Sequence, residues 1–227
     1  MTIHRLATTA STVVDATCLA RQGAGHGTAV VAEEQTAGIG RHGHSWHSEP
    51  GAGLYLSIVL RLPAAAPTLT MALGLAVQRA IDDTAQVSTD LRWPNDVMLN
   101  ERKLAGIMVQ SADPGVLIAG IGVNVNHSAF PDDISALATS LKLETGHAHD
   151  KESLMQRVLA ECLRYVQLDK AEVLRRFEQH SSYIKGKSVI VDEKLRGVTA
   201  GLDPNGFLLL RTETGIETIL AGGVRPA

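Results

Sequence analysis

The residues from Glu33 to Trp46, EEQTAGIGRHGHSW, combine three glycines with an arginine, and this combination suits the binding of an anion. Gly38, Gly40 and Gly43 let the backbone turn sharply and bring its N–H groups close to carboxylate or phosphate oxygens. Arg41 adds a fork of permanently charged donors. The segment therefore predicts a loop that wraps around a ligand, although an ordinary glycine-rich surface loop has the same composition.

The spacing in this loop does not reproduce the common phosphate-binding motifs. The GxxxxGK[ST] motif requires a lysine before Ser45, where the chain has His44. The dinucleotide motif GxGxxG fits only in part, because it also requires a βαβ unit, and Pro50, Gly51 and Gly53 argue against one. The loop alone is therefore a weak signal.

A second informative segment runs from Leu91 to Gln110, LRWPNDVMLNERKLAGIMVQ. Its Trp-Pro-Asn-Asp sequence contains a rigidifying proline, and Asn95 and Asp96 can present oxygens to a nucleotide or to the shell of a Mg²⁺ ion. Lys103 follows a tight turn and opens another strand. The alternative for the Trp-Pro-Asn-Asp sequence is a capped turn that only joins two strands. The alternative for Lys103 is an ordinary solvated turn lysine.

Together these segments resemble the biotin protein ligase family. The sequences EEQTAG, GRHGHSW, LRWPNDV, RKLAGIMVQ and GIGVNVN occur in the order and approximate spacing of that family's catalytic domain, and five co-linear motifs are specific where each alone is not. The resemblance covers nearly the whole chain. About 30 residues precede Glu33, too few for the helix-turn-helix domain of the bifunctional repressors in the family, so a monofunctional type is expected.

The resemblance implies an ATP-dependent ligase that acts in two steps. The carboxylate of biotin attacks the α-phosphate of ATP to form biotinyl-AMP, and a lysine of a biotin carboxyl carrier domain, as in acetyl-CoA carboxylase, then takes the acyl group. The implied ligands are biotin, ATP and the Mg²⁺ that accompanies ATP, with Asp96 as a candidate metal contact. Both steps need cationic charge, orientation of two anions and exclusion of water rather than an enzyme nucleophile.

The resemblance also assigns residues to roles. Lys103 corresponds to the lysine between the biotin carboxylate and the α-phosphate, and Arg41 to the arginine that contacts the phosphate of the intermediate; these two are the expected catalytic residues. Gln35 suits the ureido ring, and Trp46 is expected either to stack on adenine or to be partly buried in the core. The expected binding set is Ser11, Thr12, Val13, Gln35, Gly38, Ile39, Gly40, Arg41, Trp46, Tyr55, Asn95, Asp96, Lys103, Gly106, Gly120, Gly122 and Asn124.

Several residues depart from the family pattern. Ile39 stands where many relatives have arginine, so either the adenylate is held more weakly or an apolar contact replaces the missing cation. Val13 stands where asparagine is usual, so the side-chain hydrogen bond that the asparagine offers to the ureido ring is absent. His42 and His44 stand where arginines are common, which lowers the charge of the loop at neutral pH. No resident metal site is expected from His42, His44 and His47, because no carboxylate or cysteine completes a ligand set.

Hydrophobic periodicity predicts the elements that hold these motifs. Apolar residues alternate over 54–60, which predicts a strand on whose other face Tyr55 can line a pocket, and helical spacing predicts a helix over 68–84. Further strands are expected near 88–93, 97–99, 103–110 and 116–125. Residues 151–180 indicate one broken helix or two. The predicted fold class is α+β, a mixed or antiparallel sheet packed with helices, as in the class II synthetase-like catalytic domain of the family.

Short strands with the sequences SVIV, GVTAGL, FLLL and ETIL follow Gly186, separated by turns. This pattern predicts a small β-barrel, in agreement with the family's C-terminal SH3-like module. We expect a catalytic domain over 1–184 and an SH3-like domain over 185–227. About 40 residues bury too little surface to be very stable alone, so the small domain should lean on the large one.

Composition restricts the partners and the cellular compartment that are expected for the protein. The chain has 227 residues, 44% of them hydrophobic, and a net charge of −3, which gives no global field for binding DNA. Cys18 and Cys162 form no disulfide or zinc pattern, and no signal peptide or membrane-spanning stretch is evident. A cytoplasmic protein without DNA or membrane partners is expected. Homodimers occur in the family, and the sequence leaves the oligomeric state open.

Two other functions remain to be separated from the first. A lipoate or octanoate transferase shares the domain architecture, but GRxGxxW and WPND-type segments argue against it. A noncatalytic sensor of biotin or its adenylate is the second alternative, favoured if Ile39 and Val13 weaken retention of the adenylate. The presence of Lys103 and Arg41 argues against that loss.

Overall fold

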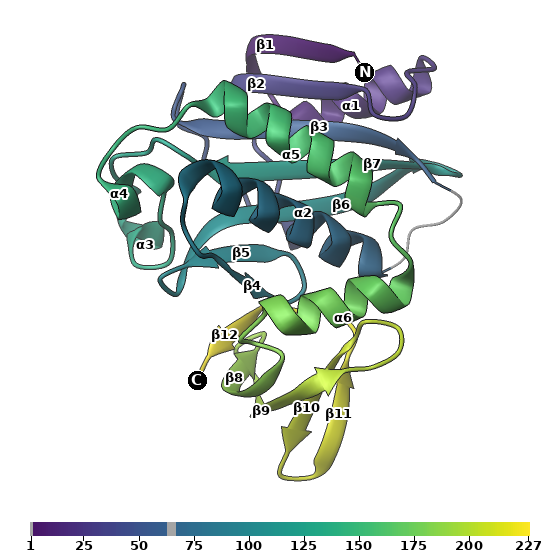
Figure 1. The fold of residues 1–227 in the computed structure, drawn as a ribbon, viewed down its shortest axis with the longest axis vertical. Helices are drawn as coiled ribbons and strands as arrows, with labels where there is room; N and C mark the ends of the chain where they lie inside the picture. The colour runs from purple at the N-terminus through teal and green to yellow at the C-terminus, as the bar shows by residue number, and fades with distance from the viewer. Residues whose placement is uncertain (1, 63–66) are drawn as a thin grey trace.

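A seven-stranded mixed sheet occupies the centre of the larger part of the molecule in the computed structural model, which describes residues 2–62 and 67–227 (Figure 1). The strand order is β1-β2-β3-β7-β6-β5-β4. β1 and β2 pair in parallel and the other neighbours are antiparallel, so the sheet is mixed, as predicted. The strands are β1 (Ile3–Thr9), β2 (Ala29–Gln35), β3 (Gly53–Arg61), β4 (Asp90–Arg92), β5 (Asp96–Leu99), β6 (Arg102–Asp113) and β7 (Val116–Asn124).

Helices cover both faces of this sheet (Figure 1). On one face α1 (Thr12–Arg21) buries Val13, Ala16 and Ala20 against β2, β3 and β7. On the other face α2 (Pro67–Ala85) and α5 (Lys151–Tyr165) pack on the main core. Because both faces are covered, β3 is buried from Gly53 to Leu60. The alternation of side chains along this strand therefore does not divide a core face from a pocket face.

The predicted helix over 68–84 is confirmed as α2, and the region 151–180 forms two helices, α5 and α6 (Lys170–His180). The break has a local cause: the carboxylate of Asp169 accepts a hydrogen bond from the N–H of Glu172 and so caps a new helix. The sequence pattern did not predict β1, α1 and β2, nor the short helices α3 (Asp132–Ser135) and α4 (Leu141–Thr145).

The C-terminal strands form a second, antiparallel sheet in the order β11-β10-β9-β8-β12. Within the described residues no ladder joins β11 to β12, so the expected small barrel is instead an open five-stranded sheet. β12 is only three residues long and includes Pro226, which has no N–H to donate. The strands are β8 (Lys185–Val191), β9 (Leu195–Leu202), β10 (Leu208–Thr212), β11 (Gly215–Ile219) and β12 (Val224–Pro226).

The two sheets share one hydrophobic core. Val189, Val191, Leu208 and Leu210 belong to the same cluster of buried residues as α2 and α5. The indole N–H of Trp93 also donates to the carbonyl of Gly206 at 3.0 Å, across the two parts. The C-terminal sheet is therefore supported by the larger part, as its small size requires.

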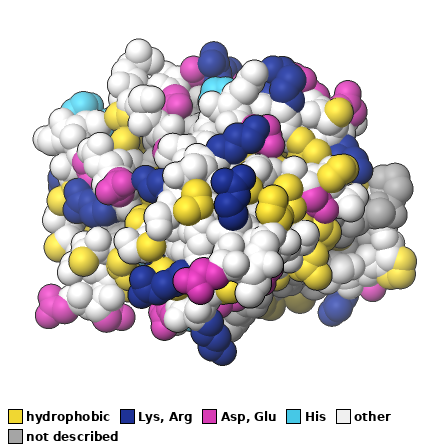
Figure 2. Space-filling view, turned by 90° about the horizontal axis from the view of Figure 1, so that it is seen from below, with side chains coloured by type: hydrophobic (Ala, Val, Ile, Leu, Met, Phe, Trp, Pro, Cys, Tyr) yellow, Lys and Arg dark blue, Asp and Glu magenta, His cyan; other side chains and the backbone are white. Residues whose placement is uncertain are grey.

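Figure 2 views the molecule from the end that carries the C-terminal sheet. On this face basic and acidic side chains are interspersed with hydrophobic ones, and no extended area of one charge is visible. Exposed hydrophobic residues of the C-terminal part include Val198 in β9, Ile216 in β11 and Leu220 just after β11. Among the helices in the described ranges, none combines the length and the apolar character that crossing a bilayer requires.

Candidate active site

The glycine-rich segment folds into a closed hairpin-like loop. The N–H of Trp46 donates to the carbonyl of Gly38 at 2.9 Å, and the N–H of Gly40 donates to the carbonyl of His44 at 2.7 Å. A Cβ at residue 38 would lie 2.7 Å from the carbonyl oxygen of Trp46, so only glycine allows this closure. The tip is a single 3-10 turn, Arg41–Gly43, which aims Arg41 back toward the sheet.

One cavity collects side chains from this loop, from the start of α1, from the β4-β5 turn and from β6 and β7. Arg41, Lys103 and Gln35 all line it, although they come from separate segments of the chain. This convergence is what the predicted chemistry requires. The predicted site residues that line the cavity are Thr12, Val13, Gln35, Ile39, Gly40, Arg41, Trp46, Asn95, Lys103, Gly106, Gly120 and Gly122.

Lys103 is held in place by its side chain and by its backbone. Its ammonium group lies 2.6 Å from Oδ1 of Asp96, whose Oδ2 accepts a 2.7 Å hydrogen bond from Arg92. The backbone of Lys103 donates to the carbonyl of Leu137 and accepts from the N–H of Thr139. Consequently the segment after β7 is bonded to the backbone of Lys103, and its conformation is coupled to the position of this lysine.

The charge of Asp96 depends on its two cationic neighbours. Burial alone would raise the pKa of Asp96, but the charges of Lys103 and Arg92 outweigh the loss of hydration and hold that pKa below its ordinary value. Asp96 is therefore an anion at neutral pH, and its carboxylate positions the ammonium group of Lys103 at the edge of the cavity.

Asn95 connects the glycine loop to the sheet. Its side-chain oxygen accepts a 2.7 Å hydrogen bond from Nη1 of Arg41, and its side-chain nitrogen donates to the carbonyl of Ile107 at 3.0 Å. The amide can serve both because it carries an acceptor and donors. The Trp-Pro-Asn-Asp turn thus orients both cations of the cavity, Arg41 through Asn95 and Lys103 through Asp96.

A hydrogen-bond network orients Gln35 in the cavity wall. The side-chain oxygen of Gln35 accepts from the N–H of Thr12 at 2.9 Å and from its hydroxyl at 3.1 Å. The Thr12 hydroxyl is also 2.8 Å from that of Ser57, which is completely buried. Because the oxygen is fully engaged by Thr12, the amide N–H₂ of Gln35 is the group that remains to donate to a ligand.

The indole of Trp46 lies on the glycines of β6 and β7. A Cβ at residue 122 would lie 2.4 Å from the indole, and one at residue 106 would lie 2.9 Å from it. The ammonium group of Lys103 is 5.5 Å from the centre of the same ring, within range of a cation–π interaction. Gly106 and Gly122 are therefore glycines because a flat ring occupies the space where a side chain would stand.

Gly122→Ala is expected to push Trp46 off the sheet toward water. The new methyl group would overlap the ring, and the half-buried indole can move whereas a central strand cannot. The tryptophan emission maximum should shift to longer wavelength. Gly74→Ala is the matched control, because its Cβ would meet only ordinary contacts at 3.8 Å inside α2. An emission spectrum unchanged by Gly122→Ala would contradict this packing.

Five predicted residues lie outside the cavity lining. Gly38 accepts the hydrogen bond from Trp46 that closes the glycine loop, and Asp96 pairs with Lys103. The Asn124 side chain donates to the carbonyl of Thr139. Ser11 is buried, with its hydroxyl unpaired. Tyr55 was predicted to line the pocket, but its ring is completely buried and its hydroxyl donates to the carbonyl of Glu49. Burial raises the pKa of Tyr55 to about 12.

Sequence reasoning missed four apolar residues of the lining: Leu56, Ile107, Met108 and Ile121. They carry no chemical signal of their own, and neighbouring apolar residues in the same strands are core residues. Of the loop histidines, His44 is exposed, and the side chain of His42 lies outside the part that the structure describes. His47 is half-buried and faces His127 instead.

The sequence matches two family models. Residues 9–128 match the biotin/lipoate A/B protein ligase family, and residues 186–224 match the biotin protein ligase C terminal domain. Among curated relatives, the bifunctional ligase/repressor BirA of Bacillus spizizenii is 34% identical, over 91% of this chain and 68% of that protein. The biotin--[acetyl-CoA-carboxylase] ligase of Mycobacterium tuberculosis is 33% identical, over 96% of this chain and 86% of that protein.

Solved structures with the same fold include ligand complexes. The biotin protein ligase of Aquifex aeolicus in complex with biotin and ATP superposes with a TM-score of 0.89 at 31% identity, and the match covers 100% of this chain and 99% of that one. The biotin protein ligase of Leishmania major in complex with biotinyl-5-AMP has a TM-score of 0.70 at 23% identity, covering 97% of this chain and 99% of that one, and this match supports the fold alone.

Proposed function

The chain belongs to the biotin/lipoate A/B protein ligase family, and from this membership we infer that it is an ATP-dependent biotin ligase. It activates biotin as biotinyl-5′-AMP and transfers the biotinyl group to a lysine of a biotin carboxyl carrier protein. The main structural support for this assignment is that Arg41, Lys103 and Gln35 line one cavity.

In the first step the biotin carboxylate attacks the α-phosphorus of ATP and pyrophosphate leaves. Lys103 stands at the cavity edge with its ammonium group held by Asp96, and it neutralises the two anions that must approach each other. The amide N–H₂ of Gln35, fixed by Thr12, donates to the ureido carbonyl of biotin. This arrangement supplies positioning and charge without a nucleophile from the protein.

In the second step the amine of the carrier lysine attacks the acyl carbon of biotinyl-AMP and AMP leaves. Until the carrier arrives, the mixed anhydride must stay bound and away from water. Arg41, held by Asn95, is the cation that retains the phosphate of the intermediate. Trp46 offers the flat face on which the adenine can stack.

Magnesium is proposed to be bound by the phosphates of ATP and not to be coordinated by the carboxylate of Asp96. Both oxygens of Asp96 already pair with cations, Oδ1 with Lys103 and Oδ2 with Arg92. A third cation at this carboxylate would be repelled by the first two. The residues present therefore do not fit a magnesium site at Asp96, and the role of that carboxylate is to position Lys103.

Ile39→Arg is expected to slow the dissociation of biotinyl-AMP. Ile39 lines the cavity with 43% of its surface exposed, so a longer, charged side chain has room to reach the phosphate. One added charge-assisted hydrogen bond contributes roughly 1.5–3 kcal/mol, or about tenfold to a hundredfold in lifetime. Release of radiolabelled adenylate from the preformed complex measures this rate. An unchanged rate would show that the isoleucine already compensates.

The activity is tested by mixing the purified chain, biotin, ATP-Mg²⁺ and a carrier domain, and by measuring the mass of the carrier. A ligase adds the mass of one biotinyl group, and a carrier whose acceptor lysine is replaced by arginine stays unmodified. Lipoate in place of biotin tests the transferase alternative. An unmodified carrier together with tight biotin binding would favour the noncatalytic sensor.

We also propose that the carrier is a domain of a carboxylase and that the protein acts in the cytoplasm. A carboxylase carrier domain follows from the names of two relatives, which are biotin--[acetyl-CoA-carboxylase] ligases. A monomer and a homodimer remain the two candidates for the oligomeric state, and sedimentation with and without biotin and ATP distinguishes them. No part of the mechanism above requires DNA or a membrane.

A further inference from the structure

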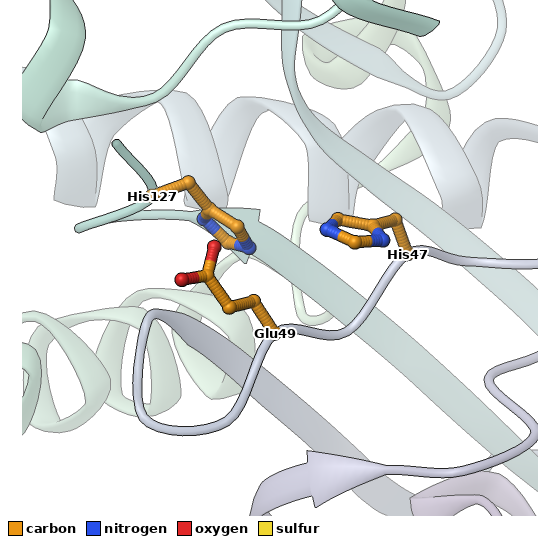
Figure 3. A group of neighbouring side chains, drawn as sticks. All are labelled: His47, Glu49 and His127. Atoms are coloured by element: carbon orange, nitrogen blue, oxygen red, sulfur yellow. The ribbon is translucent and has the colours of Figure 1, made fainter. Parts of the chain in front are cut away.

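Three side chains with metal-binding atoms meet beside the candidate active site: His47, Glu49 and His127 (Figure 3). Each of them offers one atom such that all three atoms lie within 4.8 Å of one another. Figure 3 shows the Glu49 carboxylate next to the His127 ring and one nitrogen of His47 turned toward both. His47 and Glu49 come from the segment after the glycine loop, and His127 comes from the segment after β7.

The hydrogen bonds around His127 determine which of its nitrogens carries the free lone pair. The Tyr55 hydroxyl has one proton and donates it to the carbonyl of Glu49 at 3.0 Å. The Tyr55 oxygen is also 3.2 Å from Nε2 of His127, so Nε2 must be the donor in that contact. Nδ1 is then unprotonated, and this nitrogen is buried without any hydrogen-bond partner.

An unprotonated nitrogen without a partner is costly in the interior of a protein, and His127 is completely buried. Metal-binding histidines typically donate the N–H of their other nitrogen to a fixed acceptor, which orients the ring. Tyr55 provides that acceptor here. The unpartnered Nδ1 is thus a second observation, independent of the clustering, that points to a ligand.

We propose that His47, Glu49 and His127 bind a divalent first-row transition metal ion of the Zn²⁺ class. Two imidazoles and one carboxylate are ligands that Zn²⁺ prefers, whereas Mg²⁺ prefers oxygen ligands. Three protein ligands leave a fourth tetrahedral position for water. Tetrahedral Zn²⁺ with ligand bonds of about 2.1 Å separates ligand atoms by about 3.4 Å, so the cluster must contract. Exposed Glu49 and half-buried His47 are free to do so.

A metal ion at this position would connect the segment after the glycine loop with the segment after β7. His47 directly follows Trp46, which lies on the cavity floor. The carbonyl of His127 accepts a hydrogen bond from Ser140, next to Thr139, whose N–H binds the backbone of Lys103. The bound ion would therefore restrain both segments, while its binding itself does not depend on the ligase activity.

Equilibrium titration of the full-length chain with Zn²⁺, in competition with a chromophoric chelator, tests the proposal. We expect one site per chain, with an affinity at least tenfold lower in Glu49→Gln and in His47→Gln, and no comparable binding of Mg²⁺. His147→Gln is the matched control, because His147 and His149 form another close histidine pair, with ring centres 4.5 Å apart, outside the proposed site. Equal affinity of the parent and both ligand variants overturns the proposal.

Two further measurements keep the test independent of folding defects. Zn²⁺ should raise the melting temperature of the parent and of His147→Gln but not that of Glu49→Gln, whose altered side chain is exposed. Tyr55→Phe removes the acceptor of the Nε2 proton and should weaken Zn²⁺ binding tenfold to a hundredfold, as loss of such an acceptor typically does. Binding that disappears in His147→Gln alone would place the ion elsewhere and refute the assignment.

Discussion

Lys103→Ala is expected to lower the rate of biotinyl-AMP formation by about 10²–10³-fold, the cost of removing one preorganised charged group from a transition state. The ammonium group reaches the cavity edge because Asp96 holds it at 2.6 Å and because its backbone is bonded to Leu137 and Thr139. Alanine retains the backbone contacts and removes only the charge. Biotin binding should be partly retained, because Gln35 and Thr12 are untouched.

Pyrophosphate release measures this step, and binding of biotin without ATP measures the retained affinity. Lys185→Ala is the matched control, since Lys185 also faces a carboxylate, that of Glu178, but at the C-terminal sheet and 70% exposed. Lys103→Ala leaves Asp96 with Arg92 as its cationic partner. The thermal unfolding of Lys103→Ala should therefore be measured, to separate lost stability from lost catalysis. Pyrophosphate release at the parent rate would remove Lys103 from its assigned role.

Arg41→Gly is expected to increase the labelling of bystander lysines about tenfold to a hundredfold. Without the guanidinium group, the phosphate of biotinyl-AMP loses a charge-assisted hydrogen bond worth roughly 1.5–3 kcal/mol, and the reactive intermediate escapes into solution. Asn95 loses its partner in the same variant, so the loop is also less firmly attached to β6. Adenylate formation itself should fall less than release rises.

Biotin incorporated into an unrelated lysine-rich protein, detected with streptavidin, measures this escape. His44→Gly separates the lost charge from added backbone freedom, because His44 lies in the same loop and is exposed. Asn95→Ala should have a smaller effect in the same direction, since it retains the arginine and removes only its acceptor. Labelling at the parent level in Arg41→Gly would contradict the role of Arg41 in retaining the intermediate.

Much of the fold was predictable because its signals are local. Helical spacing from Leu69 to Ile81 determines α2, and the strands from β3 to β7 follow from apolar runs bounded by turns. The N-terminal β1 and α1 were missed because they are short and largely half-buried or exposed, so few residues of either carry a pattern. The C-terminal strands were also predicted, but the pattern did not decide whether the small β-domain closes, because short strands with turns describe an open sheet and a barrel equally well.

The sequence by itself determined which chemical groups are present: a glycine loop with one arginine, a Trp-Pro-Asn-Asp turn and a lysine at the start of a strand. Only the tertiary structure decided which of them share a cavity, and it places Tyr55 and Asp96 outside the cavity lining, where they contact Glu49 and Lys103. It also brought His127 to His47 and Glu49, a ligand set that no local pattern contains. The physical reason is that spacing along the chain reports local geometry, whereas proximity across a sheet depends on strand order and packing.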